Sequence, residues 1–440
     1  MINLKNEFIT EKIKAIKEEE NVYSIGRVSK IQDYVVEVSG LDDAAYFDEV
    51  RIGEDSVGYV ADISLNSISV VIVKQNNEIH VGDEVVTTGK EFTASYSEDS
   101  LGKIIDMFGV DKMKDMKFSN SIDILLEEKC TPIMDRSSVN KPLHTGIVGI
   151  DLLYPIGKGQ RQLIIGDKKT GKTQIALDTI ASLKDDNVIC IYTAIGKTKK
   201  DVREVYYELN RHGAMKNTII LCALNDELTP VLSLTPYAAL AIAEHYLKQQ
   251  KDVLVVLDDL KRHADAYREI ALLTNRAPGR EAYPSDIFYT HARLLEKGCQ
   301  HINGGSISIL PIVETKTSQI TDYISTNIIS ITDGQIVCSK DNFDKGQRPA
   351  IDYGLSVSRL GGAVQTKRIS KLGSKIRREL LSYMEKQDVY ELANKDEMSP
   401  EMRSLLSKGQ TILECLNQYK FEAKNEDEII SIFEQLEKED

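Results

Sequence analysis

The chain has 440 residues, of which 42% are hydrophobic and 28% are charged, as is ordinary for a soluble globular protein of two or three domains. The formal net charge of −13 argues against a broad nucleic-acid-binding surface. No run of about 18 apolar residues occurs, so no transmembrane helix is expected, and the charged N-terminus does not fit a secretory signal.

The spacing of apolar residues changes once within the first 90 residues, from a helical to an alternating pattern. Apolar residues at helical spacing across 2–19 predict a helix over residues 1–20, which packs on its own domain or docks a partner. From 21 to 90, apolar and polar residues alternate between Gly, Asn and Asp turns. This pattern predicts a small antiparallel β-barrel.

The middle of the chain alternates buried-strand runs with helical stretches. The runs QLIIG, NVICIYTAIG, NTIILCAL, DVLVVLDD and SISILPIVE predict a mostly parallel sheet with helices on both faces. We therefore assign residues 91–365 to an α/β domain. Helical periodicity returns over 366–440, where Pro400 is well placed to begin a helix, and predicts a C-terminal helical domain. The six cysteines are scattered and are expected to be reduced.

A phosphate-binding loop follows the first of these strands. GDKKTGKT, residues 166–173, fits the pattern G-x-x-x-x-G-K-[ST] and opens a helical stretch. The loop amides and helix N-terminus would bind the β-phosphate, and Lys172 would place charge near the β- and γ-phosphates. Lys168 and Lys169 add charge there or form a solvated loop edge. The nucleotide-binding residues predicted from this motif are Gly166, Asp167, Lys168, Lys169, Thr170, Gly171, Lys172, Thr173 and Gln174.

A second signal is the carboxylate pair Asp258-Asp259, which ends the buried strand VLVVLDD. In P-loop proteins a strand-end aspartate holds Mg²⁺ through water, and the loop threonine ligates the same ion. Thr173 and Asp258 are thus the predicted Mg²⁺ residues of an ATP or ADP site. The alternative reading of the pair is a helix cap.

The stretch AIGKTKKDV, residues 194–202, lies where related motors place the carboxylate that activates a water for attack, and it carries Lys197. A protonated lysine donates hydrogen bonds and accepts none. Glu204 lies seven residues further along a helix and is expected to point elsewhere. The site is therefore expected to hold ATP without quick turnover.

Two further segments carry arginines. The charge-rich segment NRAPGREAYPSDIFYTHARLLEKG, residues 275–298, suggests an inter-subunit surface. GLSVSRLGG, residues 354–362, places Arg359 among small residues, where it could reach a neighbour's phosphates. The alternative is an ion pair with a carboxylate of its own domain.

Together these motifs, in this order, resemble the alpha subunits of F-type ATP synthases over nearly the whole chain, to about residue 435. PIGKGQRQLIIGDKKTGKTQIALDTI is similar to the phosphate-loop region of that family. The segment 275–298 is similar to one peculiar to alpha subunits, and TDYISTNIISITDGQIVCSKDNFDKGQRPAIDYGLSVSRLGGAVQ to its continuation.

The resemblance implies a RecA-like nucleotide-binding domain in a hexamer of three alpha and three catalytic beta chains around a gamma-type shaft. It also implies a delta-type stalk subunit bound through residues 2–19, and a place at the cytoplasmic face of a bacterial membrane with only indirect membrane contact. Nucleic acid is not an expected partner.

The family's site residues carry over one by one. Alpha subunits bind Mg-ATP without turnover and have Gln at the position that matches Lys197. The arginine finger offered to the beta site matches Arg359, and the adenine-pocket residues match Phe343, Arg348 and Gln418.

Departures from the family pattern indicate a divergent branch. A second adenine-pocket Gln of the family falls on Lys420. Ser285 and Ser325 also differ, and family chains continue several dozen residues further.

Two other hexameric motors share the core. A homohexameric secretion-type export ATPase has a similar length but needs the catalytic Glu where Lys197 stands. An RNA-translocating hexamer is disfavoured by the acidic balance and by the lack of an aromatic-rich basic barrel.

Overall fold

The computed structural model describes residues 25–53, 55–65, 67–316, 320–390 and 400–438. The helix predicted over residues 1–20 lies outside the described residues. The described residues up to 93, together with 228–231 and 266–278, form one compact unit, and the other described residues form a second. Within the described ranges, no helix is both long and apolar enough to cross a membrane.

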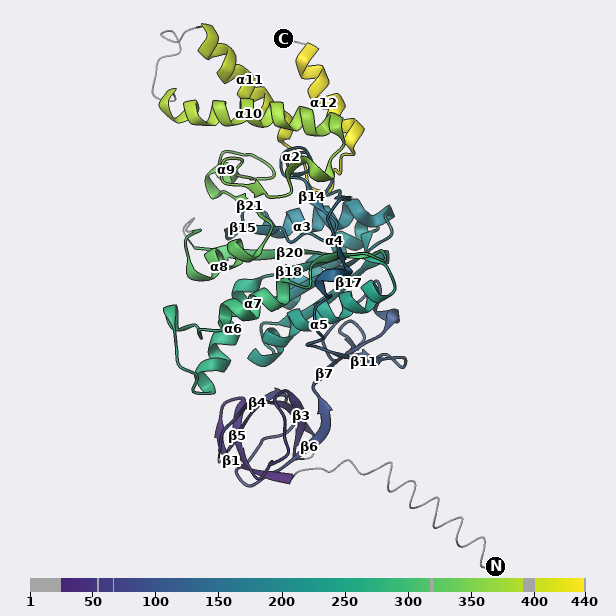
Figure 1. Cartoon of the computed structure of the whole chain (residues 1–440), viewed down its shortest axis with the longest axis vertical. Coiled ribbons are helices and arrows are strands. Elements are labelled where there is room, and N and C mark those ends of the chain that lie inside the picture. The colour runs from purple at the N-terminus through teal and green to yellow at the C-terminus, as the bar shows by residue number, and fades with distance from the viewer. Residues whose placement is uncertain (1–24, 54, 66, 317–319, 391–399, 439–440) are drawn as a thin grey trace, which may run out of the picture. The chain divides into compact units, whose positions relative to one another are not determined.

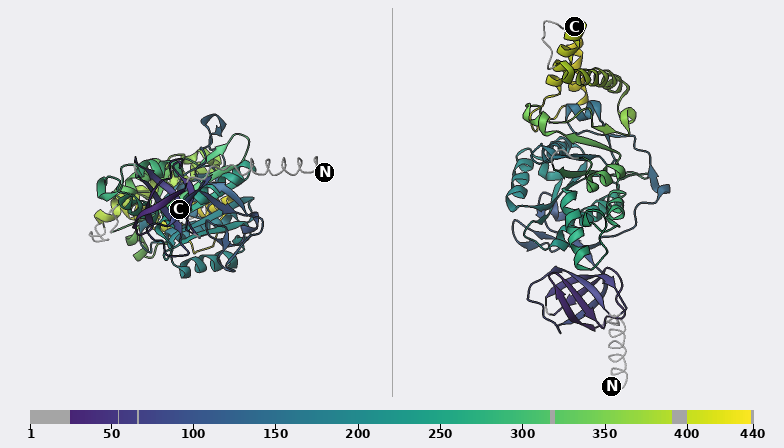
Figure 2. Two further views of the ribbon diagram at one scale, coloured as in Figure 1. Left: turned by 90° about the horizontal axis from the view of Figure 1, so that it is seen from below. Right: turned by 90° about the vertical axis from the view of Figure 1, so that its left-hand side faces the viewer.

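The first unit is built on a closed antiparallel barrel, drawn in purple in Figures 1 and 2. Its strands run in the order β1-β2-β5-β4-β3-β6. Val36, Val50, Val60 and Val70 are fully buried, because alternate side chains of each strand point inward. The barrel predicted from the alternation is confirmed. The strands are β1 Ile25–Gln32, β2 Val35–Ser39, β3 Asp48–Ile52, β4 Ser56–Ile63, β5 Ile68–Lys74 and β6 Glu84–Glu91.

The second unit contains a large, mainly parallel sheet. Its central strands lie in the order β8-β17-β16-β18-β20-β15-β21, with all neighbours parallel. The apolar runs of the sequence form these strands, which are buried on both faces. The parallel α/β domain predicted from these runs is confirmed. The bounds are β8 Ile104–Ile105, β15 Leu163–Asp167, β16 Val188–Lys197, β17 Thr218–Leu224, β18 Asp252–Asp258, β20 Ser306–Thr315 and β21 Gly334–Cys338.

Short antiparallel strands extend the sheet at its margins, and two small ladders lie apart from it. The marginal strands are β9 Val110–Asp111, β10 Met116–Lys117, β12 Arg136–Ser137, β19 Cys299–His301 and β22 Val357–Ser358. The ladders pair β7 Thr93–Tyr96 with β11 Ile122–Leu125, and β13 Pro142–Leu143 with β14 Ile156–Gly157.

Helices connect the strands and pack on the sheet. Because parallel strands need crossover connections, a helix follows most of the central strands. The helices of the central region are α2 Val148–Leu153, α3 Lys172–Ser182, α4 Lys199–Arg211, α5 Thr229–Lys248, α6 Leu260–Leu273, α7 Ile287–Leu295, α8 Tyr323–Ile331 and α9 Lys340–Asp344. Short 3₁₀ turns occur at Glu98–Ser100, Ile133–Asp135, Leu183–Asp185, Ala214–Asn217, Arg280–Ala282 and Gly361–Val364.

The C-terminal part of the second unit is helical, as the sequence predicts, and is drawn in green to yellow in Figure 1. Its helices are α10 Lys367–Tyr390, α11 Pro400–Leu416 and α12 Glu426–Lys438. Leu380, Ile412, Leu416 and Phe433 are buried between them. This cluster is continuous with the apolar core around β15 and α3, so the helices and the sheet share one core.

Candidate functional site

The phosphate loop joins β15 to α3 and is shaped by its glycines. A Cβ added at Gly166 would lie 2.2 Å from the carbonyl oxygen of Cys338 on the neighbouring strand β21, so no larger residue fits. Gly171 precedes the first residue of α3 with φ 93°, a left-handed conformation that favours glycine. The sequence therefore makes a tight loop that ends on a helix N-terminus, the geometry that binds phosphate.

Internal hydrogen bonds hold the loop in place. The Asp167 carbonyl oxygen accepts from Thr170 Oγ1 at 2.8 Å and from Lys172 Nζ at 2.5 Å, and Asp167 Oδ1 accepts from Thr315 Oγ1 at 2.7 Å. Lys172 is only 7% exposed, and its burial lowers the pKa of the ammonium group despite nearby carboxylates such as Glu314. Bound phosphate would give this buried cation an anionic partner.

Asp258 is the centre of the polar cluster beside the loop. Its carboxylate is fully buried at the end of β18. Oδ2 accepts from Thr173 Oγ1 and from Tyr192 OH, both at 2.7 Å, and Oδ1 lies 2.7 Å from Lys197 Nζ. β16 brings Lys197 here because it pairs in parallel with β18, with Ala194 opposite Asp258.

The charges of this cluster influence one another. Burial opposes the charge on Lys197, but the attraction of Asp258 outweighs it, so the pKa of the lysine is raised and it stays protonated. Burial, followed by repulsion from Asp258, raises the pKa of Asp259 to about 6. A protonated lysine held by a carboxylate cannot accept a proton from water.

These residues line one cavity of ≈ 570 Å³. Its walls include residues of the phosphate loop and the start of α3, Lys197, Asp258 and Asp259. Glu204 also lines the cavity, so the expectation that it points elsewhere is wrong. Helix α4 begins at Lys199. Three of its acidic residues, three or four positions apart, therefore lie on one helix face that lines the cavity: Asp201, Glu204 and Glu208.

Among the lining residues that sequence reasoning missed are Tyr192 and Glu314. Glu314 lies near the carboxyl end of β20, the strand between β18 and β15. The signal was available in principle, since ligands of parallel sheets bind at the carboxyl ends of strands. Tyr192 carries no such signal, because it lies inside an apolar run.

The predicted Mg²⁺ residues do come together, since Thr173 Oγ1 and Asp258 Oδ2 are 2.7 Å apart. Mg²⁺ is held in such sites by carboxylate charge and by waters on the carboxylate. Here Oδ2 of Asp258 already accepts two hydrogen bonds, and Oδ1 accepts none but faces the ammonium group of Lys197 at 2.7 Å. The donor set at Asp258 therefore does not fit a magnesium ion, and Mg²⁺ stays a prediction from the sequence.

A neighbouring cavity of ≈ 410 Å³ contains the residues predicted to bind the base, Phe343, Arg348 and Gln418. The Arg348 guanidinium carbon lies 3.5 Å from the centroid of the Phe343 ring, so the two form a flat stacked wall. Gln174, Gly171 and Lys420 line both this cavity and the phosphate cavity. The base and phosphate regions thus adjoin, as one nucleotide requires.

Gln418 has a second role. Its amide oxygen accepts from the backbone N–H of Val148 at 3.0 Å, and its Nε2 donates to the carbonyl oxygens of Gly146, at 2.7 Å, and Glu422. The amide group is committed to joining the C-terminal segment to the start of α2. Its contribution to base binding is therefore by contact more than by hydrogen bonding.

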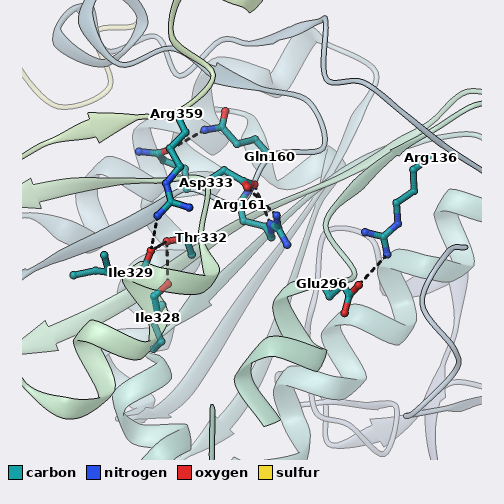
Figure 3. A network of polar contacts seen from close by, with 10 residues as sticks. Arg136, Gln160, Arg161, Glu296, Ile328, Ile329, Thr332, Asp333 and Arg359 are labelled. Carbon is teal, nitrogen blue, oxygen red and sulfur yellow. Dashed lines mark hydrogen bonds and ion pairs between the residues drawn. The ribbon is translucent and has the colours of Figure 1, made fainter. Parts of the chain in front are cut away.

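Arg359 lines neither cavity. Figure 3 shows its surroundings. Its backbone N–H donates to the Asp333 carbonyl oxygen at 2.9 Å, and its exposed guanidinium group reaches only the Ile329 carbonyl oxygen, at 3.5 Å. The nearby Asp333 carboxylate is held by the fork of Arg161, at 2.9 and 2.7 Å. Among the described residues Arg359 has no ion pair with a carboxylate.

Several charged side chains of segment 275–298 form hydrogen bonds or ion pairs with other residues of the same chain. Arg276 Nη2 donates to the Ala61 carbonyl oxygen at 3.2 Å, Arg293 pairs with Glu127 at 2.5 Å, and Glu296 lies 4.0 Å from Arg136. Figure 3 shows the last of these pairs. Arg280 and Glu281 are exposed.

The parallel sheet, the phosphate loop and the adjoining base cavity define a P-loop nucleotide-binding protein. Residues 146–358 match the model of the ATP synthase alpha/beta family, nucleotide-binding domain. The match supports the alpha/beta family for this domain, and the barrel before it and the helices after it fit the same architecture. The family implies ATP or ADP binding and a place in the hexameric head of a rotary-type ATPase.

Proposed function

We propose that the chain is the non-catalytic, alpha-type subunit of such a head, and that it offers Arg359 to the catalytic site of a beta-type partner. The observation that carries the first half is the Lys197–Asp258 ion pair of 2.7 Å. It supports this half because the resemblance puts the catalytic carboxylate at this position, whereas Lys197 is a cation held by the fully buried carboxylate of Asp258.

The three carboxylates that α4 contributes to the cavity do not supply that base. Asp201 is occupied at the start of α4, where its Oδ2 accepts from Thr198 Oγ1 at 2.8 Å. Glu208 faces Lys420 at 3.6 Å. Glu204 is exposed and lies on α4, two turns away from the strand ends that position the reacting phosphate.

The second half rests on the exposed guanidinium fork of Arg359, whose contact is with the Ile329 carbonyl oxygen and not with a carboxylate. An arginine held by a carboxylate of its own domain would be a structural residue, whereas Arg359 has none among the described residues and lies at the surface. A fixed backbone and an exposed fork suit delivery to a neighbour's phosphates. The gamma-type shaft, the delta-type stalk and the membrane-face location belong to the same proposal.

The test is ATP hydrolysis by the purified full chain. We expect nucleotide binding with negligible turnover. The Lys172→Ala chain, purified in the same way, measures the background from contaminating ATPases. Steady turnover of about 10 s⁻¹ that the Lys172→Ala chain lacks would overturn the proposal, and would favour a homohexameric export-type motor instead.

A further inference from the structure

Asp258 has partners from its own chain on both sides, although Oδ1 pairs with Lys197 by charge and accepts no hydrogen bond. Thr173 and Tyr192 donate to Oδ2, and Lys197 Nζ contacts Oδ1, each at 2.7 Å. The carboxylate is 0% exposed, whereas the side chain of Lys197 is 27% exposed and faces the phosphate cavity. A positive charge is thus built into the wall of the cavity, on the same carboxylate as Thr173, the second residue of α3.

We propose that the ammonium group of Lys197 replaces the divalent cation at this site, so that the chain binds ATP or ADP without Mg²⁺. The inference rests on the nucleotide binding of the proposed function and not on the absence of hydrolysis. Lys168, Lys169, Lys172 and Lys197 all line the cavity. Together they offer the phosphates the positive charge that a metal ion supplies elsewhere.

A bound Mg²⁺ would conflict with this arrangement. To coordinate waters on Asp258, the ion would have to displace Lys197 from Oδ1 and then stand beside the released ammonium group. Among the described residues Lys197 forms no second ion pair, although the carboxylates of Asp259 and Glu314 also attract it. Asp201 lies one turn away on α4, but its carboxylate caps that helix.

The experiment is a titration of the full chain with ATP by calorimetry, once in excess Mg²⁺ and once in EDTA. We expect the wild-type Kd measured in EDTA to be no more than about threefold higher than the Kd measured in Mg²⁺, and it can be lower. In the Lys197→Gln chain the uncharged amide leaves Asp258 without its cation. EDTA should then weaken ATP binding by about tenfold or more.

A matched control is Lys199→Gln. Lys199 lies two residues further on, is exposed, and pairs with Asp226 at 3.1 Å outside the phosphate cavity. This chain should behave as the wild type in both buffers.

A second experiment counts the bound metal directly. Mn²⁺ replaces Mg²⁺, and its electron paramagnetic resonance signal reports how many ions are bound to the ATP-loaded chain. We expect less than one Mn²⁺ per site in the wild type and about one in Lys197→Gln.

The wild-type measurement decides the matter even if a variant fails to fold. A wild-type Kd that rises about tenfold in EDTA, with one Mn²⁺ per bound ATP, would show that Lys197 gives way to the metal and would overturn the inference. Failure to bind ATP in either buffer would overturn it together with nucleotide binding itself. Hydrolysis by the chain would contradict only the proposed non-catalytic role.

Discussion

At the scale of single residues, the phosphate loop is held by its own side chains. Lys172 is buried, and its Nζ donates to the Asp167 carbonyl oxygen at 2.5 Å. Burial of an ammonium group is unfavourable unless an anion or a set of acceptors is close. The phosphates of a nucleotide would relieve this, so binding and loop stability should be coupled.

We predict that Lys172→Ala weakens ATP binding to this chain by about 100-fold, which is about 2.7 kcal/mol. In a hexamer with the beta-type partner, hydrolysis should persist, because the bonds break at the partner's sites. Calorimetry on the chain and steady-state turnover of the hexamer measure the two effects. Loss of all turnover in assembled mutant hexamers, with nucleotide still at the beta-type sites, would contradict the non-catalytic role.

Asp178 gives a prediction about pH. It lines the base cavity, and burial raises its pKa to about 6, although Phe421 N–H and Gln174 Nε2 donate to it at 2.9 and 2.8 Å. The folded chain therefore holds this proton more tightly than the unfolded chain does. The resulting stability is fully present below about pH 4, the ordinary aspartate value, and is lost as pH rises through about 6.

We expect the stability of Asp178→Asn, relative to the wild type, to rise between about pH 4 and pH 7, by up to about 3 kcal/mol. Thermal unfolding midpoints over this range measure the trend. Asp123→Asn, at an exposed position of β11, is the control and should show no such trend. A difference between Asp178→Asn and wild type that stays constant with pH would refute the assignment.

The residues of the phosphate loop and Asp258 were predictable, because each follows a buried strand in a recognisable pattern. The partner of Lys197 was not, since it depends on β16 and β18 being neighbours although β17 lies between them in sequence. The hydrogen bonds of the Gln418 amide group with Gly146 and Val148 could not be predicted from the sequence either. Such contacts join residues some 270 positions apart.

At the scale of elements, the sequence predicts which segments form strands and which form helices, but it does not predict how these elements are arranged in space. The apolar runs identify β15, β16, β17, β18 and β20, but nothing in them states the order β17-β16-β18-β20-β15. The inward face of α4 was misjudged for a related reason. Which side of a helix faces a cavity depends on where the helix begins, and the Thr198 capping box sets that start at Lys199.

The contact between α10 and α11 depends on a glycine. A Cβ added at Gly409 would lie 2.1 Å from Cγ of Tyr383, which is only 8% exposed. Alanine gains about 1 kcal/mol of helix propensity over glycine, whereas overpacking costs about 1–3 kcal/mol. At 2.1 Å the ring must move as a whole, so the overpacking term should prevail.

We therefore expect Gly409→Ala to loosen α10 and α11 and to speed amide hydrogen exchange in both. Ser404→Ala, at an exposed position of α11, gains propensity without a clash and should leave exchange unchanged or slower. Exchange is the better readout, because a chain of several units need not unfold in one step. Slower exchange in Gly409→Ala would show that Tyr383 yields without cost.

At the scale of the whole molecule, the chain combines a nucleotide cavity in which Lys197 stands at the proposed base position with an arginine that has no carboxylate partner among the described residues. Each is incomplete alone, and both are explained if the chain works beside a second kind of subunit. β22 pairs with β21 at the edge of the sheet, which fixes the backbone next to Arg359. The guanidinium fork remains exposed, because Arg161 already occupies Asp333.

The last prediction concerns that fork in the assembled hexamer. A guanidinium group offers a rigid set of donors that matches the spread charge of a transferring phosphoryl group, and lysine offers only a point charge. Arg359→Lys should lower hydrolysis by about 10³-fold or more, while nucleotide still binds to the beta-type site. Arg378→Lys, at an exposed position of α10, is the matched control and should turn over normally.

Single-turnover hydrolysis and hexamer content, measured on one preparation, separate the finger from a structural arginine. A structural role would reduce assembly and leave the remaining hexamers active, because the lost interaction would lie within the subunit. A finger leaves assembly intact and removes turnover, because the lost interaction forms only in the transition state. Intact Arg359→Lys hexamers with near-normal turnover would therefore exclude this arginine from the partner's chemistry and leave the chain a scaffold.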